Sequence, residues 1–313
     1  MGSFAKLGLA AIVTLASTGS GCFCAGSPGV LVGAGRDARF VTERAEMLIA
    51  AGDGIRRIAI DGSGSRLVFR GPVSIQDVGA DFRTFVLSDS DTNLLIGDAA
   101  TGGLVPVPEL AGRLSSAALS PDGARIAASR HSDFSLPQSR WVDDDAIFVV
   151  DVATLAVTTI PASSNDWPTK VAWSADGKAL WLTMAFGKPS QWLTLADGAR
   201  KSGLAAPPEG LRTDPRARSK CQQSLEADRW KPELRITDDS GAPPRVLARL
   251  EGRERGFHDY QPDFSNAMLS PACRYALFHY DRRIWAVDVR GGPLGPVAEG
   301  DVLFFLPAES AGR

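Results

Sequence analysis

The stretch Ser120-Pro121-Asp122-Gly123, with apolar residues on both sides of it, decides the fold of this chain. Proline at the second place of a turn fixes φ, aspartate favours the third place, and glycine supplies a positive φ at the fourth. Apolar runs joined by such a turn predict a β-hairpin. This turn cassette returns as Ser174-Ala175-Asp176-Gly177 and, in altered form, at residues 61–64 and 270–273.

A second hairpin signal follows the cassettes. It begins with a mainly apolar run, and such runs occur at residues 94–98, 147–151, 192–195, 234–238 and 284–288. Two successive hairpins predict a four-stranded antiparallel unit. The unit that contains residues 234–238 should have its own cassette near residue 222, but the sequence there is only a polar stretch, residues 212–231.

The spacing of these signals predicts the fold class. Four-stranded units repeated about every 50 residues are typical of a β-propeller, in which each blade covers the faces of its neighbours. A β-sandwich would also give many short strands, but its turns would not recur in a fixed order and period. We therefore expect an all-β chain with a single β-propeller of about six four-stranded blades, in the range of roughly five to seven.

The strand signal at residues 301–306 has no partner in its own unit. Apolar residues within the range 38–50 could share a blade with it. Pairing of the two chain ends would close the ring and protect the open sheet edges. We therefore expect the termini to complete the sixth blade together.

Two segments resemble the TolB-type, WD-repeat-like β-propeller family. They are Leu119-Ser120-Pro121-Asp122-Gly123-Ala124-Arg125-Ile126-Ala127 and Val171-Ala172-Trp173-Ser174-Ala175-Asp176-Gly177-Lys178-Ala179-Leu180. The resemblance covers residues 55–300 and implies the propeller alone, without the α/β domain that precedes it in TolB or the hydrolase domain of propeller peptidases. Such blades serve transport machines, peptidase gates, lactonases and scaffolds, so the resemblance implies a fold and leaves the function open.

The N-terminus resembles a bacterial export signal. Lys6 precedes an apolar stretch at residues 7–16, which is followed by small residues and Cys22. Small residues directly before a cysteine resemble a lipobox, which implies cleavage before Cys22 and acylation of its thiol. Gly19 departs from that pattern, since leucine, valine or isoleucine is usual there. Secretion as a soluble protein and an uncleaved anchor therefore stay open.

These observations predict the domain organisation and the location. We expect a signal and lipobox region at residues 1–24, a flexible tether at 25–37 and the β-propeller at 38–313. The expected location is the bacterial cell envelope, with the chain lipid-anchored to a membrane, and the alternative is a soluble periplasmic or secreted protein. The net charge of −2 and the pI near 6.0 give no basic field, so we expect no nucleic-acid partner.

The cysteines of the folded body suggest a disulfide. Cys273 stands at the glycine position of its cassette, and Cys221 lies where the missing cassette should be, about one blade earlier. Two irregularities at equivalent places of adjacent blades, in an exported chain, predict a Cys221–Cys273 disulfide. The alternative is two buried free thiols.

Aromatic and acidic residues outside the strand signals mark a candidate binding surface. Exposed aromatic side chains are frequent anchors at interfaces, and blade insertions gather on one face of a propeller. The alternative is that the tryptophans pack between blades and that the acidic run is a solvated loop. The candidate residues are Trp141, Asp143, Asp144, Asp145, Trp167 and Trp230.

An enzyme-like cluster is the weaker candidate. His258 and Asp259 precede the last cassette, while His279 and Asp281 follow it, so imidazole and carboxylate groups could bind a metal or act as acid and base. Ordinary polar residues at loops and strand edges would give the same pattern. A Gly-x-Ser-x-Gly elbow and a His-Glu-x-x-His motif do not occur in the sequence. We expect no resident metal and no cofactor.

Two functional hypotheses follow. The first is a non-enzymatic, envelope-anchored propeller that acts as a binding scaffold for another envelope protein, a peptide or a glycan, and that contacts the membrane through its N-terminal lipid. The second is a propeller-type, metal-dependent hydrolase or lyase of the lactonase kind that acts on a small molecule. Stoichiometric metal in the purified protein would favour the second.

Overall fold

The turn cassettes form tight turns between adjacent antiparallel strands. The Ser120 hydroxyl donates a hydrogen bond to the Asp122 carboxylate (2.5 Å), which also accepts one from the backbone N–H of Ala124 (3.0 Å). The bond from Ser120 lowers the pKa of Asp122. Gly123 has a φ of 72°, which favours glycine. The cassette at residues 174–177 repeats this arrangement, so the sequence pattern corresponds to a defined turn geometry.

The computed structural model describes residues 30–110, 114–130, 146–161, 168–185, 187–203, 206–208, 210–212, 214, 221–227, 233–238, 241–251 and 264–306. These residues form six antiparallel sheets of four strands each, here called blades 1 to 6. The number and kind of sheets confirm the predicted fold class, an all-β propeller of six blades.

The strands follow one another in chain order within most blades. Blade 1 holds β24 (Asp301–Phe305), β2 (Glu46–Ala51), β3 (Gly54–Ala59) and β4 (Arg66–Arg70); blade 2 holds β5 (Ser74–Val78), β6 (Thr84–Ser88), β7 (Leu94–Asp98) and β8 (Gly103–Pro106); blade 3 holds β9 (Leu114–Leu119), β10 (Arg125–Arg130), β11 (Ala146–Asp151) and β12 (Val157–Pro161); blade 4 holds β13 (Pro168–Trp173), β14 (Ala179–Met184), β15 (Gln191–Thr194) and β16 (Arg200–Ser202); blade 5 holds β17 (Gln223–Ala227), β18 (Glu233–Asp238), β19 (Arg245–Glu251) and β1 (Val30–Leu31); blade 6 holds β20 (Ser265–Leu269), β21 (Tyr275–Tyr280), β22 (Arg283–Asp288) and β23 (Leu294–Glu299).

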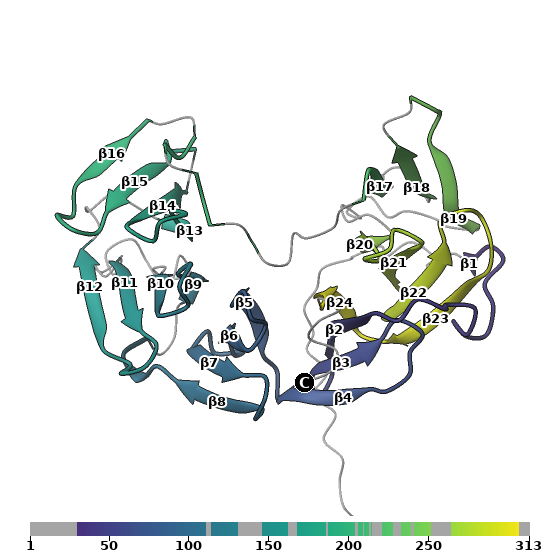
Figure 1. Cartoon of the computed structure of the whole chain (residues 1–313), viewed down its shortest axis with the longest axis horizontal. Coiled ribbons are helices and arrows are strands. Elements are labelled where there is room, and N and C mark those ends of the chain that lie inside the picture. Colours follow the sequence, from purple (N-terminus) through teal and green to yellow (C-terminus); the bar gives the residue numbers. More distant parts are fainter. Residues whose placement is uncertain are drawn as a thin grey trace, which may run out of the picture.

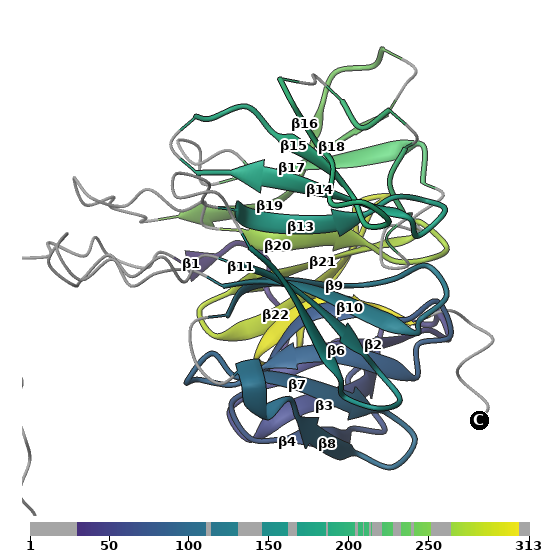
Figure 2. The same cartoon turned by 90° about the vertical axis from the view of Figure 1, so that its left-hand side faces the viewer.

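The blades are arranged around a central axis, with the first strand of most blades nearest to it (Figure 1). Figure 2 shows the ring from the side. Because adjacent strands alternate in direction, the turns between first and second strands and between third and fourth strands lie on one face of the ring, here called the turn face. The other connections lie on the opposite face, here called the loop face. The cassettes therefore all belong to the turn face.

Strands from the two ends of the chain close blade 1. β24 is its innermost strand and pairs with β2 in the register Met47↔Phe305 and Ala50↔Asp301. Val302 and Phe304 of β24 are buried, so the pairing also adds apolar side chains to the contacts with the neighbouring blades. The predicted sharing of one blade by the two termini is confirmed.

One predicted cassette copy is wrong. Residues 61–64 join β3 to β4, which are the third and fourth strands of blade 1, so they are not a first-to-second-strand turn. The copy in blade 2 is instead residues 79–82, Gly79-Ala80-Asp81-Phe82. Its backbone hydrogen bonds from Gly79 to Thr84 and from Phe82 to Gly79 match those of residues 120–123, although Phe82 adopts the positive φ of 54°.

The N-terminal residues cross two blades before they enter blade 1. β1 pairs with β19 at the outer edge of blade 5, and Ala34 then forms a β-bridge with Leu294 of blade 6. Glu43 reaches the last cassette, where its carboxylate accepts hydrogen bonds from Ser270 (2.6 Å) and the N–H of Ala272 (2.9 Å). The segment expected to be a flexible tether, residues 25–37, therefore includes a strand.

Blade 5 reaches four strands in a different way from the others. β17 packs against the inner strand β20 of blade 6, as the second strand β10 packs against the inner strand β13. β17, β18 and β19 thus occupy the second, third and fourth positions, and β1 is added outside them. Within the described part of the chain, the innermost position of blade 5 holds no strand.

Buried apolar residues fill five of the six junctions between blades. Separate clusters join blades 1 and 2, 2 and 3, 3 and 4, 5 and 6, and 6 and 1. Among the described residues, no cluster joins blades 4 and 5. This junction, here called the seam, separates the sheet of β13–β16 from that of β17–β19 in the upper part of Figure 1.

A buried ion pair holds the chain where it leaves blade 4. Arg212 donates to the Asp77 carboxylate and to the carbonyl oxygen of Val78 in blade 2, and its backbone N–H bonds to Trp173 of blade 4 (2.9 Å). The side chains of Arg212 and Asp77 are 11% and 8% exposed. Asp77 also accepts the backbone N–H of Leu119 in blade 3 (2.7 Å). Removal of either charge would leave the other buried and unpaired, which costs about 3–5 kcal/mol.

The role of β24 can be tested by truncation. Deletion of residues 301–313 should abolish the cooperative unfolding transition or cause aggregation, because β2 would lose its inner partner and expose its edge. Deletion of residues 307–313 is the matched control and should leave the melting temperature unchanged, since β24 and Leu306 stay in place. Thermal unfolding followed by circular dichroism measures both. An unchanged melting temperature after the longer deletion would contradict this account of ring closure.

Candidate functional site

The predicted binding-surface residues lie outside the described residues. They are Trp141, Asp143, Asp144, Asp145, Trp167 and Trp230. The strands that flank them are described: β10 and β11 around the first four, β12 and β13 around Trp167, and β17 and β18 around Trp230. All three of these connections leave and re-enter the sheets at the loop face. The predicted surface therefore begins and ends on a single face of the ring.

The histidine and aspartate cluster is only partly described. His258 and Asp259 lie outside the described residues. Nδ1 of His279 is 3.3 Å from Oδ1 of Asp301, which belongs to the closing strand β24. Asp281 stands in the turn between β21 and β22 with a φ of 48°. The His279–Asp301 contact thus links the second strand of blade 6 to the inner strand of blade 1. Among the described residues, no group of three or more histidine, cysteine, aspartate or glutamate side chains is placed to hold a metal ion.

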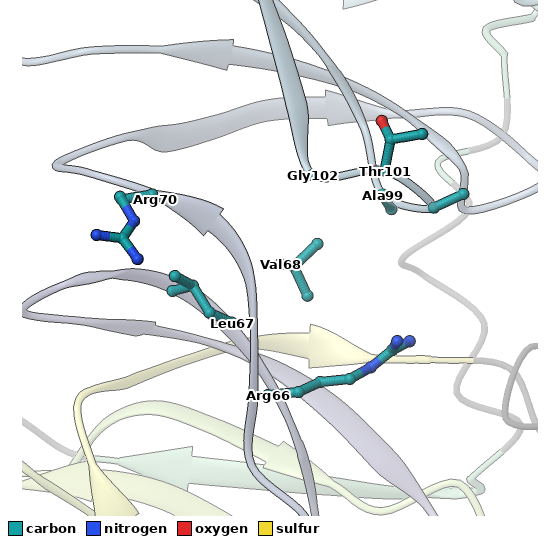
Figure 3. A pocket seen from close by; sticks show the side chains of 8 residues that line it. Arg66, Leu67, Val68, Arg70, Ala99, Thr101 and Gly102 are labelled. Atoms are coloured by element: carbon teal, nitrogen blue, oxygen red, sulfur yellow. The ribbon is translucent and has the colours of Figure 1, made fainter.

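A groove with two arginines lies between blades 1 and 2 (Figure 3). It has a volume of about 270 Å³ and is lined by β4, which carries Arg66 and Arg70, and by residues 99–102 in the turn between β7 and β8. Neither arginine forms an ion pair with a described residue. The guanidinium groups make the groove a candidate for carboxylate or phosphate groups. Sequence reasoning missed it, because two arginines on one outer strand are an ordinary solvated edge.

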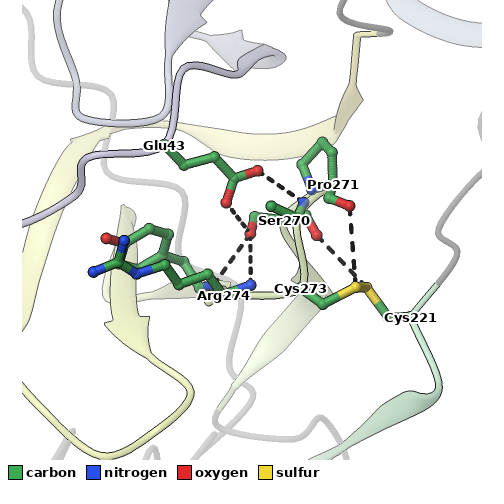
Figure 4. Close-up of a disulfide and its surroundings, with 8 residues drawn as sticks. Glu43, Cys221, Ser270, Pro271, Cys273 and Arg274 are labelled. Carbon is green, nitrogen blue, oxygen red and sulfur yellow. Dashed lines mark hydrogen bonds between the residues drawn. A yellow bond between two sulfur atoms is a disulfide. The ribbon is translucent and has the colours of Figure 1, made fainter.

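A disulfide joins Cys221 and Cys273 (Figure 4), the pair that the sequence analysis selected, with a Cα–Cα distance of 5.6 Å. Cys273 occupies the glycine place of its cassette with a φ of 58°. It lies two residues before β21, just as Cys221 lies two residues before β17. Both strands are the second strands of their blades, so the two cysteines hold equivalent places and tie β17 to the last cassette.

The tryptophans expected in the core differ in burial. Trp173 is 1% exposed and donates its indole N–H to the carbonyl oxygen of Ala118 in blade 3 (2.9 Å). Trp181 and Trp285 are half-buried. Trp181 lies opposite Trp192 in the pairing of β14 with β15, with ring centroids 6.4 Å apart. Its neighbours Leu180 and Leu182 belong to the cluster with blade 3. Because side chains alternate along a strand, Trp181 faces the seam.

In the described part of the chain, no helix is long and apolar enough to cross a membrane. No family model matches the chain, and no curated protein matches its sequence. Similar folds occur among solved structures. TolB from Acinetobacter baumannii is 15% identical with a TM-score of 0.43, over 87% of this chain and 67% of that chain. The β-propeller domain of Cps50 (Swd1) from Myceliophteria thermophila is 12% identical with a TM-score of 0.41, over 90% of this chain and 89% of that chain. Values this low say nothing about what the chain binds.

The disulfide has a measurable effect on stability. It closes a loop with a sequence separation of 52, for which the chain-entropy model gives about 4 kcal/mol. Reduction should therefore lower the melting temperature by several degrees, since ~1 kcal/mol shifts a domain of this size by about 2–4 °C. Non-reducing peptide mapping of the exported protein should find the Cys221–Cys273 linked peptide. Alkylation of both thiols in the unfolded, unreduced protein would show that the bridge does not form.

Proposed function

We propose that this chain is an exported β-propeller that is lipid-anchored at Cys22 and binds another protein of the cell envelope through its loop face. The observation that carries the proposal is the common position of two features on that face. The three connections that hold Trp141, Trp167 and Trp230 begin and end there. The N-terminal strand β1 also starts at that end of blade 5, since Val30 pairs with Glu251, the last residue of β19.

The length of the N-terminal segment supports a position close to the membrane. Residues 23–29 separate the acylated cysteine from β1, and an extended chain of this length spans at most about 25 Å. A lipid at Cys22 would thus hold the outer edge of blade 5 within that distance of the bilayer. The loop face would lie nearer to the membrane than the turn face. A partner at the loop face is then a membrane-bound or membrane-proximal protein.

Acylation at Cys22 can be tested directly. The Cys22→Ala variant, expressed in a bacterial host, should lose incorporation of labelled fatty acid and move from the membrane to the soluble fraction, because a protein without acyl chains has no stable anchor. Cys24→Ala is the matched control and should keep both the label and the membrane location. Equal membrane retention of the Cys22→Ala variant, with no label in the wild type, would rule out the lipid anchor.

Partner binding at the loop face can be tested by cross-linking in intact cells. A photoreactive amino acid at position 141 or 167 should give a discrete cross-linked product, because aromatic side chains at these places would contact the partner. The same group at Ala153, an exposed position in the turn between β11 and β12, reports on the turn face. Products of equal yield from position 153 would contradict the assignment to the loop face.

A further inference from the structure

The seam leaves one strand edge of the ring unpaired. In the other five blades, the innermost position is filled by β24, β5, β9, β13 and β20. In blade 5 the innermost described strand is β17, which pairs with β18 on its outer side alone. Adjacent residues of an antiparallel strand alternate their backbone groups between its two sides. β17 therefore directs N–H and C=O groups toward the ring centre with no described strand to receive them.

The side chains of β17 match the place of a second strand. Leu225 and Ala227 pack on the cluster that joins blades 5 and 6, while Ser224 and Glu226 are exposed on the other side. Oε1 of Gln223 is buried and accepts no hydrogen bond from a described residue. No described cation pairs with Glu226. Polar groups of both kinds thus stand ready beside the free edge.

The opposite wall of the seam is aromatic. Trp181 on β14 faces it with its ring paired to Trp192. In the neighbouring junction, the corresponding second strand β10 presents Ala127 to the inner strand β13 of the next blade. The half-buried Trp181 therefore holds the position that elsewhere in the ring contacts the innermost strand of the following blade.

The ends of the connection across the seam both lie at the turn face. Leu211 forms a β-bridge with Ser174, and Arg212 bonds to Trp173 at the end of β13. Cys221, at the start of β17, is tied to Cys273 in the last cassette. An inner strand would have to enter from the loop face. The connection is only residues 213–220, which span at most about 28 Å, and crossing the seam uses part of this length.

We propose that the free inner edge of β17 is a binding site for an extended segment of another envelope protein, which adds to blade 5 as its innermost strand. The inference deepens the proposed function, on which it rests for the kind of partner. Main-chain hydrogen bonds to β17 supply affinity, as in other cases of strand addition. The segment is mainly apolar, because one of its faces meets β20 and the other meets Trp181. A basic residue suits it, because Glu226 lies at the edge.

A probe peptide of this chemistry exists within the chain. The inner strand of blade 4, Pro168–Trp173, is mainly apolar and carries Lys170. A fluorescent peptide of residues 167–174 should bind the full-length protein. The same peptide with Val171→Pro should bind at least about tenfold more weakly, because proline removes a ladder donor and distorts the strand. Fluorescence anisotropy measures both affinities.

Hydrogen exchange locates the peptide. In the free protein, the amides of residues 223–227 that do not bond to β18 should exchange fast, and the peptide should slow them at least about tenfold. The amides of β10 serve as the control and should not change. Exchange of all β17 amides in the free protein as slow as in β21 would overturn the proposal, because a segment of this chain would then occupy the edge.

Two protein variants separate binding from folding. Glu226→Lys lies on an exposed position and should weaken the peptide several-fold through charge repulsion, with an unchanged melting temperature. Trp181→Ala should also weaken it, and its melting curve reports whether the fold survives. Equal binding of the two peptides, or unchanged affinity in the Glu226→Lys and Trp181→Ala variants, would sink the inference.

The tests distinguish this inference from the proposed function. Cross-linking at position 141 together with failure of the peptide at β17 would remove the strand-addition site and leave the loop-face scaffold standing. Binding of the peptide at β17 without cross-linking or a lipid label would keep the edge as a site and remove the envelope partner.

Discussion

An unpaired row of backbone N–H and C=O groups at the centre of a sheet ring is costly, and this constraint governs how the ring is closed. The end of the chain meets it in blade 1, where β24 supplies the innermost strand to β2. In blades 2, 3, 4 and 6 the first strand of each unit does the same. Blade 5 is the one place in the described chain where the constraint is not met, and the features around the seam follow from that fact.

Three interactions stabilise the ring beside the seam in place of an apolar cluster. The Cys221–Cys273 disulfide fixes the start of β17 to blade 6. The buried Arg212–Asp77 pair joins the end of blade 4 to blade 2, across the inner strand of blade 3. β1 covers the outer edge of β19. Covalent, ionic and backbone bonds thus replace side-chain packing at this junction, so the two blades are held in place while the inner edge of β17 stays free.

The repeat could be predicted from the sequence because its turn requires particular residues. Proline, aspartate and glycine at residues 121–123 each satisfy one backbone requirement, so the pattern survives as letters. Where the geometry is kept by other residues the pattern fails: residues 79–82 form the same turn with Phe82 at a positive φ, and residues 61–64 imitate the letters in a different turn. Cys273 was readable because it displaced a glycine. The long-range Asp77–Arg212 pair and the arginine groove left no local signal, since they depend on residues brought together only by closure of the ring.

The position of β24 also sets the order of events when the chain emerges from a membrane. An exported chain is threaded from its N-terminus, so β2, β3 and β4 reach the far side long before their inner partner does. Blades 2 to 4 can assemble from consecutive residues as they appear, whereas blade 1 waits with a bare edge until the last residues arrive. Each molecule therefore passes through a stage as an open arc, and the slowest part of its maturation is expected to be the joining of its two ends rather than the formation of any single blade.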